Sequence, residues 1–217
     1  AAAGRSTFVL KQLGKVRVSA PRSSGLAREA GFPPGGVNRG HGGPGVVGRL
    51  VGHPDVRAVS LGGSTRAGEH IYRTAAAHGK RVQCMCGAKN HSIIMPDANR
   101  GAAIEGVLGS AFGNSGQRCL AGSVVVCVDD SADWLVPGLV EAAGAIKVDK
   151  GDAPGCGMGP MQDMEGKERV HEAIEKGVEQ GATLVMDGRE HQMPSGGCFV
   201  GPTIFDNAKP GMFIVDE

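Results

Sequence analysis

The spacing at which apolar residues recur along the sequence changes several times between the start of the chain and Met95. Short β-branched runs indicate strands, and stretches with apolar residues three or four apart indicate helices. In order, these segments are TFVLK, SSGLAREAG, VRAVSL, STRAGEHIYRTAAAHG, RVQCMC and SIIM. Strands that alternate with helices are typical of βαβ units, so the pattern predicts an α/β fold with a parallel sheet.

The helix expected from Ser64 has the clearest signals. Ser64 or Thr65 can cap its first turn, and Gly79 supplies a left-handed stop at its end. Its apolar positions, four residues apart, are Ala67, Ile71 and Ala75. The spacing predicts one helix face against the sheet.

A second alternation follows Pro96. Helices are expected over AAIEGVLGSAF, ADWLVPGLVEAAGAI and MEGKERVHEAIEKGVEQG, and strands over SVVVCV, ATLVMDG and the end of PSGGCFVGPTIF. Pro137 is expected to loosen the middle helix, because proline removes a backbone donor. We therefore expect two domains: residues 1–95, part of a doubly wound parallel sheet, and residues 96–217, a second α/β domain. The expected site is the cleft between them.

Composition narrows the choice of partner. Lys and Arg total 23 against 22 for Asp and Glu, so the net charge of +1 argues against a nucleic acid or an acidic membrane surface. No run of 18 apolar residues exists, so we expect no membrane span. AAAGRSTFVLK has no apolar leader core, and the six scattered cysteines indicate a reducing compartment. These features favour a small-molecule partner.

The stretch SLGGSTRAG is the first candidate for chemistry. A strand followed by glycines and a helix N-terminus leaves backbone N–H groups and a positive dipole end at Gly63 and Ser64, which suits a phosphate. The stretch lacks the GxGxxG fingerprint, and the same residues also suit a plain tight connection. Taken alone, it leaves both interpretations open.

Cys119 in FGNSGQRCLAGS is the second candidate. A nucleophilic cysteine needs nearby positive charge or backbone N–H groups, and Arg118 is adjacent while Gly113 and Gly116 permit a tight turn. The N–H of Cys119 could then face a developing oxyanion. A cysteine beside an apolar strand is also a common core residue, so spacing leaves both alternatives open.

Metal binding is not expected. Cys84 and Cys86 lack a second ligand pair, so we interpret them as small apolar residues of a strand. No pair among the seven histidines has metal-ligand spacing.

Three motifs together carry a family resemblance. SLGGSTRAGE, then GAKNHSIIMPDAN, then GQRC resemble the aldehyde dehydrogenase superfamily, and with HGKRVQ they are most similar to its coenzyme A-acylating branch, the methylmalonate-semialdehyde dehydrogenases. The resemblance covers the whole chain but only the middle of the family's protein of roughly 500 residues. It implies an NAD-binding domain over residues 1–95 and a catalytic-cysteine domain over residues 96–217.

The resemblance also implies roles for single residues. Cys119 matches the nucleophile that forms a thiohemiacetal and then a thioester. Arg118 matches a residue that holds the substrate carboxylate. Gly63 and Ser64 match the turn that faces the cofactor phosphates, and Lys11 matches a lysine that contacts the adenosine ribose.

Several positions depart from the family pattern. The Pro-Ser-Glu expected after Lys11 is replaced by Gln12, Leu13 and Gly14, which removes a ribose-binding carboxylate. Hydrolytic relatives carry a water-activating glutamate where this chain has Met85, and the acylating branch usually has asparagine there. The upstream oxyanion-hole asparagine is absent, and the chain stops where a Glu-Ile-Phe-Gly-Pro motif begins. We therefore expect the stretch to be inactive alone.

Two functions follow as hypotheses. The first is NAD-dependent, coenzyme A-acylating oxidation of methylmalonate or malonate semialdehyde by a homo-oligomer in the mitochondrial matrix or a bacterial cytoplasm. The second is a degenerate homologue that serves as a non-catalytic structural or interaction subunit of a larger assembly. Met85 and the lost Pro-Ser-Glu motivate the second hypothesis, and the retained Arg118 and Cys119 motivate the first.

Overall fold

The β-branched runs become strands in the structure, a computed structural model that describes residues 6–15 and 18–217. The chain forms two compact units, Ala1–Gly87 and Ala88–Glu217. The α/β class expected from the sequence is confirmed, because parallel strand pairs alternate with helices. The stretch AAAGR at the start of the chain lies outside the described residues.

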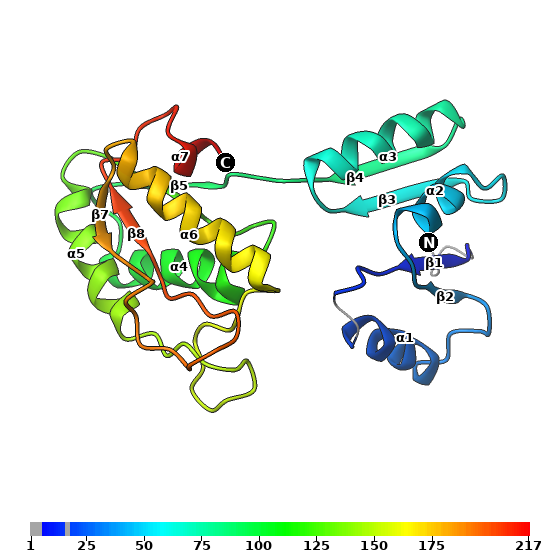
Figure 1. Cartoon of the computed structure of the whole chain (residues 1–217), viewed down its shortest axis with the longest axis horizontal. Helices are drawn as coiled ribbons and strands as arrows, with labels where there is room; N and C mark the ends of the chain where they lie inside the picture. Colours follow the sequence, from blue (N-terminus) through cyan, green and yellow to red (C-terminus); the bar gives the residue numbers. More distant parts are fainter. Residues whose placement is uncertain (1–5, 16–17) are drawn as a thin grey trace. The chain divides into compact units, whose positions relative to one another are not determined.

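The first unit is built from two βαβ units. Its elements are β1 (Phe8–Lys11), α1 (Ser19–Glu29), β2 (Val37–Gly40), α2 (Pro44–Gly52), β3 (Ala58–Gly62), α3 (Thr65–Ala77) and β4 (Arg81–Met85). Strand β1 pairs in parallel with β2, and β3 pairs in parallel with β4. Helices α1 and α3 form the crossovers, and Figure 1 shows α3 lying along β3 and β4.

Helix α3 follows its sequence signals closely. Ser64 has an extended backbone and its Oγ accepts a hydrogen bond from the N–H of Ala67 at 3.4 Å, which confirms it as the N-cap. Gly79 has a φ of 64°, so the left-handed stop is also confirmed. Ile71 and Ala75 are buried against Val51 of α2, and this contact makes the core of the first unit.

The hydrophobic pattern did not predict β2 or α2. Strand β2 reads VNRG, a short and mostly polar segment, and it forms because β1 offers it a parallel partner. Helix α2 carries three glycines but begins with Pro44, which suits a first helical position. Helix α1 begins at Ser19, four residues before the expected SSGLAREAG.

The second unit holds two strand pairs and larger helices. Its elements are β5 (His91–Ile94), α4 (Arg100–Ala111), η2 (Gly113–Gly116), β6 (Val124–Cys127), α5 (Ser131–Gly144), α6 (Met164–Glu179), β7 (Thr183–Met186), β8 (Ile204–Asp206) and α7 (Phe213–Asp216). Strand β5, which the sequence expectation assigned to residues 1–95, pairs in parallel with β6 inside this unit. Strands β7 and β8 pair antiparallel.

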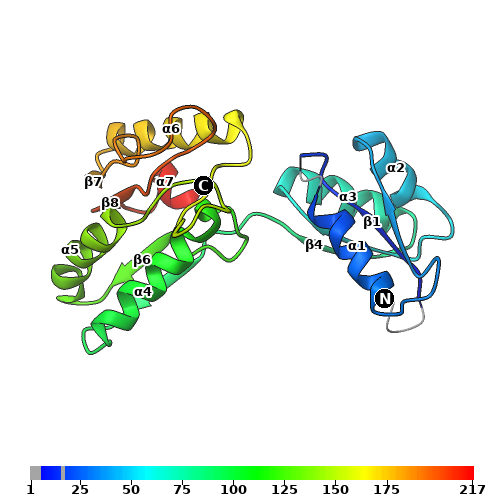
Figure 2. The same cartoon turned by 90° about the horizontal axis from the view of Figure 1, so that it is seen from below.

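Helices α4 and α5 cover one face of the β5–β6 pair (Figure 2). Ile94 of β5, Val107 of α4, and Leu135 and Leu139 of α5 form the buried cluster between them. Helix α5 runs through Pro137, so the helix expected over ADWLVPGLVEAAGAI is confirmed. Within residues 6–15 and 18–217, no helix has the length and apolar character needed to cross a membrane.

Candidate active site

The loop from Gly113 to Ser123, called the nucleophile loop below, joins α4 to β6. It starts with three consecutive residues of positive φ, Asn114 at 53°, Ser115 at 55° and Gly116 at 68°. This left-handed run reverses the chain after α4, and the side chain of Gln117 then anchors the loop. Gln117 Oε1 accepts the N–H of Gln162 at 2.9 Å.

Cys119 lies on the surface of the nucleophile loop. Its side chain is exposed, so the alternative of a buried packing cysteine is wrong, whereas its role as a nucleophile stays a prediction. The loop makes a turn in which the N–H of Ala121 donates to the carbonyl oxygen of Arg118 at 3.1 Å. Among the described residues, no acceptor takes the N–H of Cys119. That donor is therefore available to a bound group.

Asn90, directly before β5, stabilises this turn through hydrogen bonds from its side-chain amide. Its Nδ2 group donates to the carbonyl oxygens of Cys119 and of Ala121, each at 2.9 Å. Its own carbonyl oxygen accepts the N–H of Val124 at 3.2 Å, which starts the β5–β6 ladder. The sequence analysis assigned no role to Asn90, although this residue belongs to GAKNH, a motif that carries the family resemblance together with GQRC.

The guanidinium of Arg118 is held by a hydrogen bond to the main chain of α4. Its Nη2 donates to the carbonyl oxygen of Gly109 near the end of α4. Gly113 makes room for this position, because a Cβ at Gly113 would overlap the guanidinium. The guanidinium has five N–H donors, so others remain for a carboxylate, and that role stays a prediction.

The expected cofactor residues belong to the first unit. The N–H of Gly63 donates to the carbonyl oxygen of Met85 at 3.1 Å, so the end of β3 is joined to the end of β4. Ser64 then caps α3, and the N–H groups of Thr65 and Arg66 have no acceptor within the part of the chain that the structure describes. Such free donors at a helix N-terminus suit an anion.

Lys11 is the last residue of β1, half-buried and in register with Gly40 of β2. Gln12, which stands where the family pattern has proline, is buried with 6% of its surface exposed. Lys11, Gly63 and Ser64 thus share the first unit, and Arg118 and Cys119 share the second.

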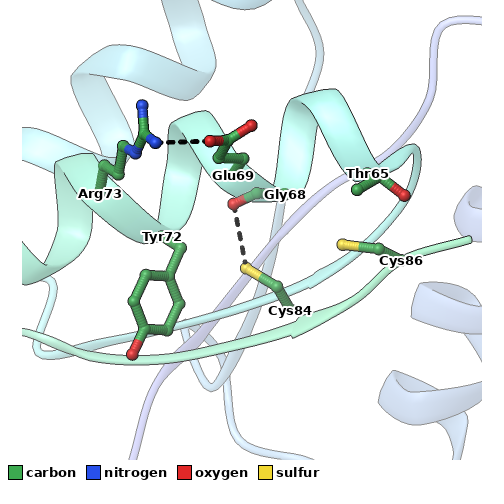
Figure 3. Close-up of a pocket in the computed structure, with 7 residues that line it drawn as sticks. All are labelled: Thr65, Gly68, Glu69, Tyr72, Arg73, Cys84 and Cys86. Atoms are coloured by element: carbon green, nitrogen blue, oxygen red, sulfur yellow. Dashed lines mark hydrogen bonds and ion pairs between the residues drawn. The ribbon is translucent and has the colours of Figure 1, made fainter.

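A pocket of ≈ 400 Å³ lies between α3 and β4 (Figure 3). Cys84 of β4 and Cys86, just after β4, both lie close to Gly68, and the Cys84 thiol donates to the Gly68 carbonyl oxygen at 3.4 Å. Burial raises the pKa of the Cys84 thiol, and the nearby Cys86 raises it further. Both cysteines are half-buried, and the residues described here contain no group of three His, Cys, Asp or Glu side chains that could hold a metal ion.

Comparison with known proteins gives a consistent picture. The profile of the Aldehyde dehydrogenase family matches residues 1–217. Malonate-semialdehyde dehydrogenase 3 of Geobacillus kaustophilus is 50% identical over 210 residues, which are 96% of this chain and 43% of that protein. The human mitochondrial acylating methylmalonate-semialdehyde/malonate-semialdehyde dehydrogenase is 42% identical over 214 residues, 98% of this chain and 40% of that protein.

Solved structures agree with these relatives. A methylmalonate-semialdehyde dehydrogenase from Oceanimonas doudoroffii has a TM-score of 0.92 at 42% identity, covering 97% of this chain and 44% of that one. A protein of Sinorhizobium meliloti, described as a methylmalonate-semialdehyde dehydrogenase complexed with NAD, has a TM-score of 0.91 at 39% identity over 97% of this chain and 44% of its own. The chain spans less than half the length of these relatives, and it belongs to the aldehyde dehydrogenase family.

Proposed function

We propose that this chain carries the nucleophile and part of the cofactor site of an NAD-dependent, coenzyme A-acylating semialdehyde dehydrogenase. The substrates would be malonate semialdehyde or methylmalonate semialdehyde, by similarity to the named relatives. The observation that carries the proposal is the exposed Cys119 on a turn whose neighbouring carbonyl groups are hydrogen-bonded while its own N–H has no acceptor among the described residues. This activity is proposed for a chain of the relatives' length.

Cys119 would attack the carbonyl carbon of the aldehyde. A bond forms between Sγ and that carbon, and the carbonyl electron pair moves onto oxygen. The free N–H of Cys119 is the donor that would stabilise this oxyanion. Arg118 would orient the substrate through its carboxylate with the guanidinium donors that Gly109 does not use. Both residues lie on the nucleophile loop.

The first unit fits the phosphates of a dinucleotide. The N–H groups of Thr65 and Arg66 and the Ser64 cap face the same end of α3, and Gly63 precedes them without a side chain. Lys11 would add positive charge near the ribose, although the ribose-binding carboxylate expected after it is absent. NAD, when bound, would accept the hydride that leaves the substrate carbon.

The acyl group would leave Cys119 by transfer to a thiol. Met85 is 56% exposed and has no basic atom, so it cannot activate water as a carboxylate would. Attack by the coenzyme A thiolate on the acyl carbon would form the new thioester and release the Cys119 thiolate. The human relative's description as acylating supports this route.

A second candidate function rests on Met85 and Gln12, which depart from the family pattern at two places of the cofactor half. A homologue without oxidoreductase activity would be a structural or interaction subunit of a larger assembly. For the active form we propose a homo-oligomer in a bacterial cytoplasm or a mitochondrial matrix, since the named relatives include bacterial proteins and a mitochondrial human one. Light scattering after size-exclusion chromatography measures the oligomeric state.

The experiment uses a chimera in which this chain replaces the matching 210 residues of the Geobacillus kaustophilus relative. NADH formation from malonate semialdehyde is followed with and without coenzyme A, and the acyl product is identified by mass spectrometry. The proposal expects an acyl-coenzyme A thioester, and it expects none with Cys119→Ser. A folded chimera that binds NAD but forms no NADH would refute the proposal and favour the non-catalytic subunit.

A further inference from the structure

Cys119 is held by both of its peptide planes. The plane before it contains the carbonyl group of Arg118, whose oxygen accepts the N–H of Ala121 at 3.1 Å. The plane after it contains its own carbonyl group, whose oxygen accepts from Asn90 at 2.9 Å. Two fixed planes leave the Cα of Cys119 one orientation, because the backbone has only two soft dihedral angles at each residue.

This geometry also fixes where the N–H of Cys119 points. In a trans peptide the carbonyl oxygen and the N–H lie on opposite sides of the C–N bond. The Arg118 oxygen faces into the turn, toward Ala121, so the N–H of Cys119 faces away from the turn. A hydrogen bond from Asn90 to the Ala121 carbonyl oxygen holds the far end of the same turn.

Asn90 is suited to this task by its own position. Its carbonyl oxygen is fixed by Val124 at the start of the β5–β6 ladder, so its side chain extends from ordered backbone. It is half-buried, and its one amide nitrogen donates to two carbonyl groups of the turn that contains Cys119. Aspartate has nearly the same shape but no hydrogen to donate.

We propose that Asn90 is a positioning residue that aims the N–H of Cys119 at the oxyanion formed on attack. The inference rests on the proposed function, because it takes Cys119 as the nucleophile. Without Asn90 the carbonyl oxygens of Cys119 and Ala121 lose their donor, so the turn that the Ala121 N–H closes onto Arg118 is held less firmly and the N–H of Cys119 loses its alignment. The thiol itself keeps its exposure, so Asn90 affects reactions that pass through an oxyanion and not simple displacement at sulfur.

Two probes separate these effects on the 217-residue chain. With p-nitrophenyl acetate, the Cys119 thiolate attacks the ester carbonyl, passes through an oxyanion, expels p-nitrophenolate and becomes an acetyl thioester. With iodoacetamide, the thiolate displaces iodide and no oxyanion forms. Both rates scale with the thiolate fraction, so a change in that fraction cancels in their ratio. Peptide mass spectrometry assigns each product to Cys119, and Cys119→Ser gives the background.

The variants are Asn90→Ala and the isosteric Asn90→Asp, both checked for folding by circular dichroism. We expect the ratio of acylation to alkylation to fall about tenfold in both, less than the 10²–10³ typical for outright loss of an oxyanion donor. Asn38→Ala is the matched control, because Asn38 Nδ2 donates to the Gly35 carbonyl oxygen at 2.7 Å in the other unit. Its ratio should equal that of the wild type.

An unchanged ratio in both Asn90 variants would overturn the inference. So would a wild-type ratio no higher than that of N-acetylcysteine, because Cys119 would then have no aligned donor. Neither result depends on NAD or on NADH formation. Failure of the dehydrogenase proposal is therefore distinguished from failure of the role assigned to Asn90.

Discussion

Ser115 donates its Oγ–H to the carbonyl oxygen of Gly159 at 2.5 Å, joining two loops that lie 44 residues apart in the chain. Ser115 is 9% exposed and has a φ of 55°, so a buried residue in the left-handed region is held by this part-buried hydrogen bond. Gln117 adds a second link to the same segment through Gln162. The nucleophile loop is thus anchored to the Gly159 segment before it reaches Cys119.

Ser115→Ala should lower the free energy of unfolding by about 0.5–1.5 kcal/mol, because a part-buried hydrogen bond is lost. Urea denaturation measures this change. The control is Ser123→Ala in the same loop, an exposed serine whose replacement should change stability by less than about 0.5 kcal/mol. Equal effects of the two substitutions would contradict the role of the Ser115–Gly159 hydrogen bond.

Ser64→Asp should preserve the stability of α3 while weakening NAD binding. Aspartate caps a helix as well as serine does, so the melting temperature should hold. Its negative charge would repel the phosphates, and the Kd for NAD should rise at least about tenfold. Titration calorimetry measures the Kd.

Asn99→Asp is the matched control for this prediction. Asn99 caps α4 by accepting the N–H of Ala102 at 3.0 Å, so the substitution adds the same charge at another helix start. NAD affinity should not change there. A similar loss of affinity in both variants would argue against a phosphate site at Ser64.

Substitution by alanine should change the stability of the chain in opposite directions at two glycines. Gly106 lies inside α4 with nothing near the position of a Cβ, so Gly106→Ala should stabilise the chain by about 0.5–1 kcal/mol. At Gly188 a Cβ would overlap the main chain of Gly201, which cannot move aside as a flexible side chain can. Gly188→Ala should destabilise by about 1–3 kcal/mol or more, and thermal unfolding would reveal a wrong sign at either site.

Asp187 should contribute to stability only above acidic pH. Side-chain hydrogen bonds from Arg189, at 2.6–3.1 Å, hold the pKa of Asp187 below its usual value. A lowered folded-state pKa means that the contribution is present above the unfolded value of about 3.9 and is lost as pH falls through the folded value. Asp187→Asn should therefore lower the urea midpoint at neutral pH, and the difference from wild type should shrink below about pH 4.

The control for the pH prediction is Asp152→Asn. Asp152 is exposed and has no hydrogen bond or ion pair with the residues that the structure describes. Its substitution should leave the urea midpoint close to that of wild type at each pH. A gap between wild type and Asp187→Asn that stays constant into acid would mean that the Arg189 contact is not electrostatic.

The elements with strong local signals could be predicted, and those formed by pairing could not. Helix α3 has a capping serine, a regular apolar stripe and a terminal glycine, and each signal acts within a few residues. Strand β2 has no such signal, since VNRG is polar and short, and it exists because β1 lies beside it. The helix across Pro137 was also predicted, and packing of Leu135 and Leu139 keeps α5 continuous there.

Motifs and periodicity are properties of neighbouring residues, so they were enough to predict the α/β class, the helix capped by Ser64 and the candidate residues Cys119 and Arg118. The exposure of Cys119 and the hydrogen bond from the amide of Asn90, 29 residues away, follow from the three-dimensional fold. It also directed Arg118 toward Gly109. Hydrogen bonds between distant segments depend on how strands pair, and no local pattern encodes that arrangement.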